Sequence, residues 1–156
     1  MASNRPPRAY SSQSADMIAE LRATISRLNG LGIAVVVLGP PVQFKARLPA
    51  MLMRAHLRQI EPRPEDFALP AIFSLDQTMK AALPDQTKFS YISVVDTICP
   101  ARQCPLTLPG GVPLSWDHAH LTAEGSAFVM EKIVPMFRLA WSVSDGPNAS
   151  APSAAR

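Results

Sequence analysis

Long hydrophobic runs are absent from these 156 residues. The longest unbroken aliphatic stretch, residues 33–38, is far too short to cross a bilayer, and residues 1–14 contain no apolar segment of the kind a secretory signal needs. We therefore expect neither a membrane span nor a signal peptide in this chain. Glycine is also scarce, with 7 residues against 16 prolines, which predicts rigid, irregular connections between elements.

An excess of one charge is also missing from the central part of the chain. The net charge is +3, but Arg5, Arg8 and Arg156 lie in the two tails, where Asp145 is the only acid. Residues 14–142 therefore carry nearly equal numbers of basic and acidic side chains. The basic residues are neither clustered nor interleaved with aromatic ones, as a groove that follows a phosphate backbone requires. We expect no nucleic-acid partner.

Hydrophobic residues make up 47% of the chain and charged residues 17%, which predicts a packed core. Residues 1–13 and 143–156 are rich in Ser, Pro, Ala and Asn, and we expect them to be disordered ends. The domain is then predicted to occupy residues 14–142, a length that fits a single domain.

Apolar spacing predicts the first helix and the first strand. Ile18, Leu21, Ile25 and Leu28 recur at helical steps, with Ser14 as the expected N-cap and a stop at residues 29–30. Residues 33–38 are apolar on both faces, so we expect a strand buried on both faces of a parallel sheet between helix layers.

The rest of the domain continues an alternation typical of α/β proteins. We predict helices over 49–59 and 73–83, a strand over 89–95 that ends at Asp96, and a last helix from Ala123 to about Val134. Thr122 is the expected N-cap of this helix, and Pro135 is expected to end or kink it. Two strands seldom hold a domain together, so we expect further strands upstream of Ser14 and read the chain as the C-terminal part of a larger domain.

The candidate chemistry lies in the loop before the last helix, where Asp117 and His120 form a D-x-x-H pattern. A hydrolytic triad needs an imidazole to take a proton and a carboxylate to orient that imidazole. The alternative is a polar loop in which Asp117 caps backbone N–H groups. Ser115 is the nearest hydroxyl, but no oxyanion-binding group accompanies it. We expect His118 and His56 to be solvent-exposed.

Three further features have open interpretations. Cys99 and Cys104 are either free thiols, as in a reduced cytosol, or part of a zinc site with His118 and His120, although the spacing does not match the usual ligand patterns. The turn at residues 39–41 lies where ligands bind at strand ends, or is simply a rigid strand exit. Asp96 either caps the cysteine loop or helps shape a pocket. No cofactor is expected.

The order of these features resembles a known family. A helix, the strand IAVVVLGPP, a Pro-rich segment, the strand YISVVD and a cysteine pair precede the block D-H-A-H-L-T-A-E-G. This series resembles the C-terminal part of the SGNH (GDSL-like) hydrolase domain that follows the membrane region of many bacterial acyltransferase-3 proteins, over about residues 15–138. The residues that carry the resemblance are Cys99, Cys104, Asp117, His120, Leu121, Thr122 and Gly125, with Trp116 in the place of a frequent aromatic.

The resemblance implies a three-layer α/β/α, flavodoxin-like SGNH fold, here incomplete. It implies that His120 is the general base, that Asp117 orients it, and that Cys99 and Cys104 form a disulfide. The implied activity is transfer or hydrolysis of an O-acyl group, often acetyl, on a cell-envelope polysaccharide. The implied partners are that glycan acceptor and a membrane acyltransferase-3 domain, on the periplasmic or extracytoplasmic side.

One departure from the family pattern limits this activity. Family members carry the nucleophilic serine in a G-D-S block on the first strand, and no G-D-S occurs in this sequence. Without a nucleophile, a His–Asp pair gives little rate. We therefore expect the chain to be inactive alone. The alternatives are a non-catalytic glycan-binding module and a truncated remnant without function.

Overall fold

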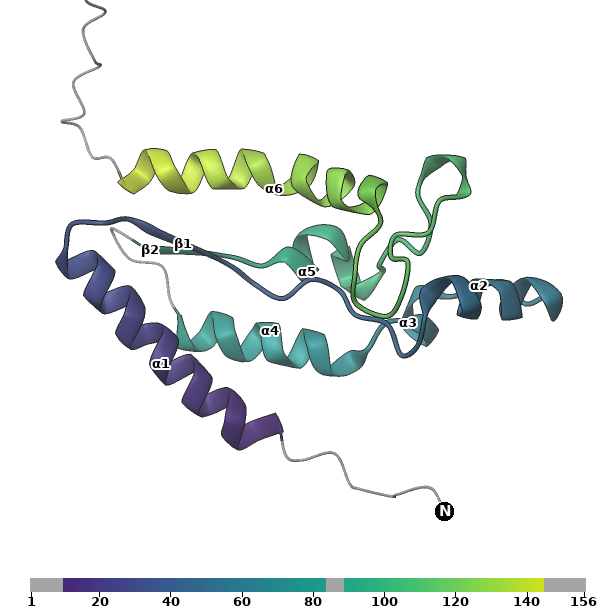
Figure 1. Cartoon of the computed structure of the whole chain (residues 1–156), viewed down its shortest axis with the longest axis horizontal. Helices are drawn as coiled ribbons and strands as arrows, with labels where there is room; N and C mark the ends of the chain where they lie inside the picture. The colour runs from purple at the N-terminus through teal and green to yellow at the C-terminus, as the bar shows by residue number, and fades with distance from the viewer. Residues whose placement is uncertain (1–9, 84–88, 145–156) are drawn as a thin grey trace, which may run out of the picture.

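A computed structural model describes residues 10–83 and 89–144 of the chain (Figure 1). The helices and strands follow one another as α1 (Tyr10–Gly30), β1 (Val35–Leu38), α2 (Leu48–Leu57), α3 (Pro64–Phe67), α4 (Pro70–Ala82), β2 (Phe89–Ile92), α5 (Val94–Ile98) and α6 (Ala123–Ser144), with two 3₁₀ turns, η1 (Pro100–Arg102) and η2 (Pro109–Gly111), before α6. Within the described ranges, every helix is too short or too polar to span a membrane.

The two strands form a parallel sheet in which Val35 lies opposite Phe89 and Leu38 lies opposite Ile92. Helix α6 runs along one face of this sheet, and α4 with α1 covers the other (Figure 1). This arrangement confirms the predicted three-layer α/β/α order. The connection from β1 to β2 passes through α2, α3 and α4, as a parallel pair requires a crossover.

Alternate side chains of β1 face different cores. Val35 and Val37 pack with a cluster that includes Ile25 of α1 and Met79 of α4. Val36 packs with the larger cluster, which includes Ile133 of α6. Successive side chains of a strand point to opposite faces, so each strand joins the two helix layers.

The prediction that the first strand is buried on both faces is wrong for this chain. Val35, Val36 and Val37 are half-buried, and Leu38 is 45% exposed. The physical reason is that β1 has one neighbouring strand, β2, among the described residues. A strand with a sequence suited to the middle of a sheet therefore lies at an edge.

The first helix begins at Tyr10, so Ser14 lies inside it and is not its N-cap. Its predicted stop is confirmed, because α1 ends at Gly30 and Gly32 then adopts a positive φ of 82°. Of the predicted disordered ends, residues 10–13 belong to α1 and residues 143–144 to α6, so the prediction is wrong there, and the rest of both ends lies outside the described residues. The predicted helices 49–59 and 73–83 correspond to α2 and α4, and α4 starts three residues early at Pro70, a residue suited to the first helical turn.

The second strand is shorter than predicted, because Val94 and Val95 belong to helix α5. The Ser93 hydroxyl accepts a hydrogen bond from the Asp96 N–H at 3.1 Å and caps this helix. Asp96 therefore lies in the first turn of α5 rather than at a strand end. A serine three residues before an acid was the signal for this helix.

Pro135 does not end the last helix, which continues to Ser144. A proline inside a helix removes one backbone hydrogen bond, here to the carbonyl of Glu131. Both Pro135 and Glu131 are exposed, so water can satisfy that carbonyl.

Candidate active site

The loop that carries the predicted site is held by two successive backbone pairings. Thr107 pairs with Pro113 around the 3₁₀ turn η2, in which Gly110 and Gly111 both adopt positive φ angles, and Ser115 pairs with Leu121 around the second turn. Inside that second turn, the Trp116 N–H donates to the His120 carbonyl at 3.0 Å. Residues 116–120 therefore form a closed five-residue turn.

The Asp117 carboxylate uses its two oxygens for different purposes. Oδ1 accepts hydrogen bonds from the N–H groups of Ala119 and His120, both at 2.7 Å. Oδ2 lies 2.7 Å from Nδ1 of the His120 ring. The two interpretations of D-x-x-H, a backbone cap and an imidazole-orienting carboxylate, thus describe the same side chain.

These hydrogen bonds determine the charge of Asp117. The backbone N–H groups of His120 and Ala119, followed by the His120 ring, hold the pKa of the Asp117 carboxyl well below its usual value. Asp117 therefore stays ionised at neutral and mildly acidic pH. An ionised Oδ2 accepts the proton of Nδ1–H, which leaves Nε2 of the neutral ring as the basic nitrogen.

Trp116 lies against the imidazole. The indole and the His120 ring are stacked, with centroids 5.6 Å apart and planes 25° apart. Both side chains are open to solvent, since Trp116 is 61% exposed and the His120 side chain 69%. Ser115 and Asp117, on either side of Trp116, are buried. The rings therefore project outward from an anchored backbone.

The segment that follows β1 is hydrogen-bonded to this turn through main-chain atoms. The Phe44 N–H donates to the His118 carbonyl at 2.8 Å, and the Leu48 N–H donates to the Asp117 carbonyl at 3.1 Å. Phe44 and Leu48 are themselves buried. The Asp117–His120 turn therefore lies beyond the carboxyl ends of the strands, where open α/β sheets bind ligands (Figure 1).

The start of α6 fixes the other side of the turn. The Thr122 hydroxyl accepts a hydrogen bond from the Gly125 N–H at 2.9 Å, which confirms Thr122 as the N-cap. The packing around Gly125 explains why the motif has glycine at this position, because a Cβ there would overlap the Leu114 carbonyl oxygen. A main-chain atom cannot move aside, so the block requires glycine here.

The cysteines are joined by a disulfide between Cys99 and Cys104. Their sulfurs are not available as thiolate ligands, and within residues 10–83 and 89–144 no group of three metal-ligating side chains comes together. The zinc interpretation is therefore wrong for this structure. His118 and His56 are exposed, as predicted.

Ser115 is fully buried, and its Oγ is the buried side-chain oxygen without a hydrogen-bond partner in the described part of the chain. A nucleophile must reach both the base and the substrate. The burial of Ser115 places its hydroxyl away from the solvent side on which His120 projects.

A second polar cluster, around Asp76 of α4, was missed in the sequence. The Asp76 side chain is fully buried and accepts hydrogen bonds from the hydroxyls of Tyr91 and Ser93, each at 2.8 Å. Its position within the apolar stripe of α4, three residues after Phe73 and three before Met79, was the available signal. The cluster ties α4 to the end of β2.

Lys80 extends this cluster to α5. Its ammonium contacts both the Asp96 carboxylate and, at 3.6 Å, the Asp76 carboxylate. The hydrogen bond to Asp96 raises the pKa of Lys80, and burial, with the hydrogen bond to Asp76, raises the pKa of Tyr91. Asp96 is therefore paired with Lys80 in the described structure, and the cluster joins three elements.

The turn after β1 packs against the same cluster. A Cβ at Gly39 would overlap the Tyr91 hydroxyl and lie 2.8 Å from Asp76 Oδ1. The Gly39 N–H also donates to the Ile92 carbonyl at 2.8 Å. Residues 39–41 thus form a close-packed strand exit.

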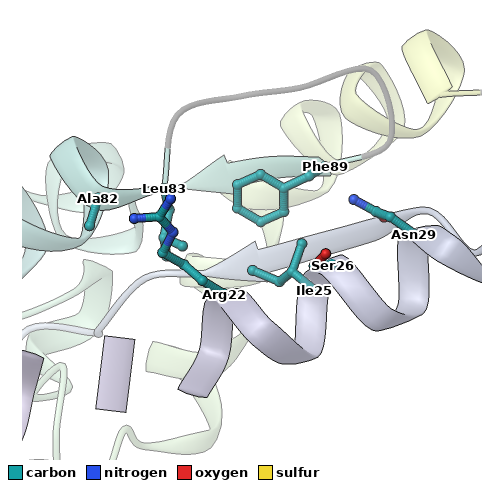
Figure 2. A pocket seen from close by; sticks show the side chains of 7 residues that line it. All are labelled: Arg22, Ile25, Ser26, Asn29, Ala82, Leu83 and Phe89. Atoms are coloured by element: carbon teal, nitrogen blue, oxygen red, sulfur yellow. The ribbon is translucent and has the colours of Figure 1, made fainter. Parts of the chain in front are cut away.

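A pocket of about 310 Å³ lies between α1 and the start of β2, far in sequence from the Asp117–His120 turn (Figure 2). It is lined by Arg22, Ile25, Ser26, Asn29, Ala82, Leu83 and Phe89. Because Phe89 begins β2, the pocket is at the amino end of this strand, opposite the end that faces the Asp117–His120 turn. None of the predicted site residues lines it.

Fold and site together define an α/β domain with a carboxylate-bound imidazole at the carboxyl edge of a parallel sheet. The model of the family described as "SGNH domain (fused to AT3 domains)" matches residues 2–135. The chain belongs to this family and corresponds to the C-terminal part of the domain. No curated protein matches the chain.

A solved structure shares the fold. The chain is similar to the periplasmic domain of a lipopolysaccharide acetyltransferase of Salmonella ser. Paratyphi A, with a TM-score of 0.69 and 19% sequence identity. The match covers 86% of this chain and 53% of that one, so the chain spans about half the length of its structural neighbour. At this identity the likeness shows the SGNH-type fold, of which the described residues contain two strands.

Proposed function

We propose that the chain supplies the histidine and aspartate of an O-acyl transfer site, most simply for acetyl, that modifies a cell-envelope polysaccharide. The observation that carries this proposal is the 2.7 Å contact between Asp117 Oδ2 and His120 Nδ1 in a ring that projects into solvent. Membership in a family whose domains are fused to acyltransferase-3 domains supports a membrane acyl donor as the partner. The periplasmic origin of the structural neighbour supports an extracytoplasmic location.

In this proposal the nucleophile is the serine of the family's G-D-S block, which these 156 residues do not contain. Its hydroxyl meets His120 Nε2, which takes the proton as the serine oxygen attacks the carbonyl carbon of the acyl donor. Asp117 holds Nδ1–H and stabilises the imidazolium that forms. The imidazolium then returns the proton to the leaving oxygen, and an acyl-serine remains.

The second half of the reaction reverses these roles. A sugar hydroxyl gives its proton to Nε2 and attacks the acyl-serine carbonyl. The serine oxygen leaves and takes the proton back from the imidazolium, so the products are an O-acylated sugar and the free serine. Residues 1–156 alone contain the proton carrier but not this serine, and we expect them to hydrolyse no aryl acetate above background.

The test compares three variants in the native cell, with polysaccharide O-acetyl content measured by mass spectrometry. His120→Ala removes the base, and Asp117→Asn keeps an oxygen for the two backbone donors but removes the acceptor that faces Nδ1. We expect each to lower transfer by about 10²-fold or more. His118→Ala, an exposed histidine in the same turn, is the matched control and should transfer normally.

Two results would contradict the proposal. One is O-acetylation that is equally high in His120→Ala and His118→Ala. The other is a chain that binds the polysaccharide equally well with and without His120 while no variant changes transfer, which is the result expected of a non-catalytic glycan-binding module. The mass of the native polypeptide in membrane fractions completes the test, because a species heavier than 16.9 kDa is expected if the acyltransferase-3 domain is its partner in the same chain.

A further inference from the structure

Trp116 is a large apolar side chain in the most exposed part of the candidate site. It is 61% exposed, although a tryptophan normally buries most of its surface. Its backbone is fixed by the hydrogen bond to the His120 carbonyl, and its neighbours Ser115 and Asp117 are buried. The exposure is therefore built into the turn.

The stacking with His120 leaves part of the indole free. One region of the indole lies against the imidazole, with centroids 5.6 Å apart. The remaining exposed surface is flat and apolar, and it belongs to the ring that stacks on the His120 imidazole. Binding sites use such surfaces because an aromatic side chain with few rotatable bonds loses little entropy when a ligand packs on it.

We propose that Trp116 is the acceptor-binding residue of this site, and that a sugar ring packs its C–H face on the indole so that a hydroxyl comes within reach of His120 Nε2. This inference rests on the proposed function and names the acceptor subsite within it. The chemistry of the occupant follows from the surface. A pyranose ring has an apolar C–H face for the indole, and its hydroxyls at the rim remain available to a base.

The one charged carboxylate within the turn fits a neutral occupant. Asp117 is ionised but directs its carboxylate to backbone N–H groups and to Nδ1. The ring nitrogen Nε2 has no hydrogen-bond partner among the described residues, so it is free to accept from a hydroxyl. Trp116 adds no charge, and the surface that it forms with His120 therefore favours a hydroxyl-bearing ring over an ion.

The experiment measures saccharide binding separately from transfer. The chain contains two tryptophans, so Trp141→Phe isolates the fluorescence of Trp116. De-O-acetylated polysaccharide from the native envelope is titrated into this variant and into Trp116→Phe. We expect the emission of Trp116 to shift on binding, and no shift in the variant that retains Trp141 alone.

Affinity is then compared by isothermal titration calorimetry, which needs no tryptophan, across substitutions at position 116. Trp116→Ala and Trp116→Leu should weaken binding about tenfold, because both lack an aromatic face, and Trp116→Phe should weaken it less. Leu57→Ala, a change at an exposed apolar residue of α2, is the control and should bind normally. Near-ultraviolet circular dichroism checks that each variant keeps its fold.

The outcomes distinguish this inference from the proposed function. If His120→Ala abolishes transfer but still binds saccharide measurably, and Trp116→Leu loses binding, both hold. If Trp116→Leu binds as tightly as the parent chain, the acceptor role is overturned while the role of His120 stands. Binding of a polypeptide that carries the G-D-S block, dependent on Trp116 and without saccharide binding, would also overturn it, since the indole would then be an interface residue.

Discussion

At the scale of single residues, the Asp117 side chain links the shape of the turn to its chemistry. One carboxylate oxygen holds the two backbone N–H groups that close the turn, and the other holds the His120 ring. Alanine at this position would remove both functions together. Asparagine separates them, and for this reason it is the informative substitution in the transfer experiment.

A second residue-scale prediction concerns Ser115, whose buried Oγ has no partner in the described structure. Removing an unsatisfied buried hydroxyl removes its desolvation cost, so Ser115→Ala should raise the free energy of unfolding by about 1 kcal/mol. Ser115→Thr adds a methyl group to a filled site and should lower it by about 1–3 kcal/mol. Urea denaturation measures both.

The Ser115→Ala variant also tests whether Ser115 is the nucleophile. Ser115→Ala should leave O-acyl transfer unchanged, because Ser115 takes no part in the proposed reaction. A loss of transfer in a stable Ser115→Ala protein would show that this hydroxyl reaches the substrate.

At the scale of elements, the Asp76 cluster joins α4, β2 and α5 through hydrogen bonds of Tyr91, Ser93 and Lys80. Tyr91 takes part as a neutral hydroxyl donor, and its pKa is raised by burial and by Asp76. A raised pKa in the folded state stabilises the fold below the unfolded value of about 10. This contribution decreases as the pH rises above about 10, where the unfolded chain releases its proton first.

We therefore predict that the free energy of unfolding falls as the pH is raised above about 10, and that it falls less steeply in Tyr91→Phe. Lys80, whose pKa is also raised, contributes in the same direction in both proteins. Absorbance at 295 nm gives a direct check, since the chain has two tyrosines. The component missing in Tyr91→Phe should titrate last. An equal slope in both proteins would contradict the role assigned to Tyr91.

Whether a segment is a helix or a strand could be predicted from the sequence wherever its apolar residues followed a single helical or strand-like pattern. The spacing of Ile18 and Ile25 identified α1, and the run of valines identified β1. Val94 and Val95 were assigned to a strand because β-branched residues favour strands, but the Ser93 cap provides a hydrogen bond that an extended chain would lack. Helix α6 passes Pro135 because the carbonyl left without a donor faces water.

The candidate site could be predicted from the sequence where its residues lie close together along the chain. Asp117 and His120 lie three residues apart, so a turn brings them together whatever the rest of the chain does. The Asp76 cluster depends on contacts between α4, β2 and α5, and no local period reports such contacts. The stacking of Trp116 on His120 likewise depends on the closed turn.

At the scale of the whole molecule, neither outer edge of the two-stranded sheet has a further strand in the described residues, and the outer edge of β1 is therefore open. In a parallel pair, alternate residues of a strand direct their N–H groups to opposite sides. The Gly39 N–H donates to Ile92 of β2, so by alternation the Val37 N–H also faces β2, and the N–H groups of Val36 and Leu38 face the open edge.

Hydrogen exchange followed by NMR tests this arrangement. We predict that the Val36 and Leu38 amides exchange at least tenfold faster than those of Val37 and Gly39, because hydrogen-bonded amides exchange only on opening. Equal protection on both sides would contradict an open edge. Addition of a polypeptide with the missing strands should slow exchange at Val36 and Leu38 selectively.

The backbone bonds from Phe44 and Leu48 to the Asp117–His120 turn have a consequence for how this protein can diverge. The turn is held through main-chain atoms, and the residues between those two anchors, Lys45, Ala46 and Arg47, are exposed. The Ala46 and Arg47 side chains can therefore be exchanged without moving the imidazole, whereas the Lys45 ammonium donates to the Asp66 carbonyl at 2.8 Å. For the proposed acyl transfer, this short strip beside the turn offers positions at which acceptor preference can change while the Asp117–His120 geometry is kept.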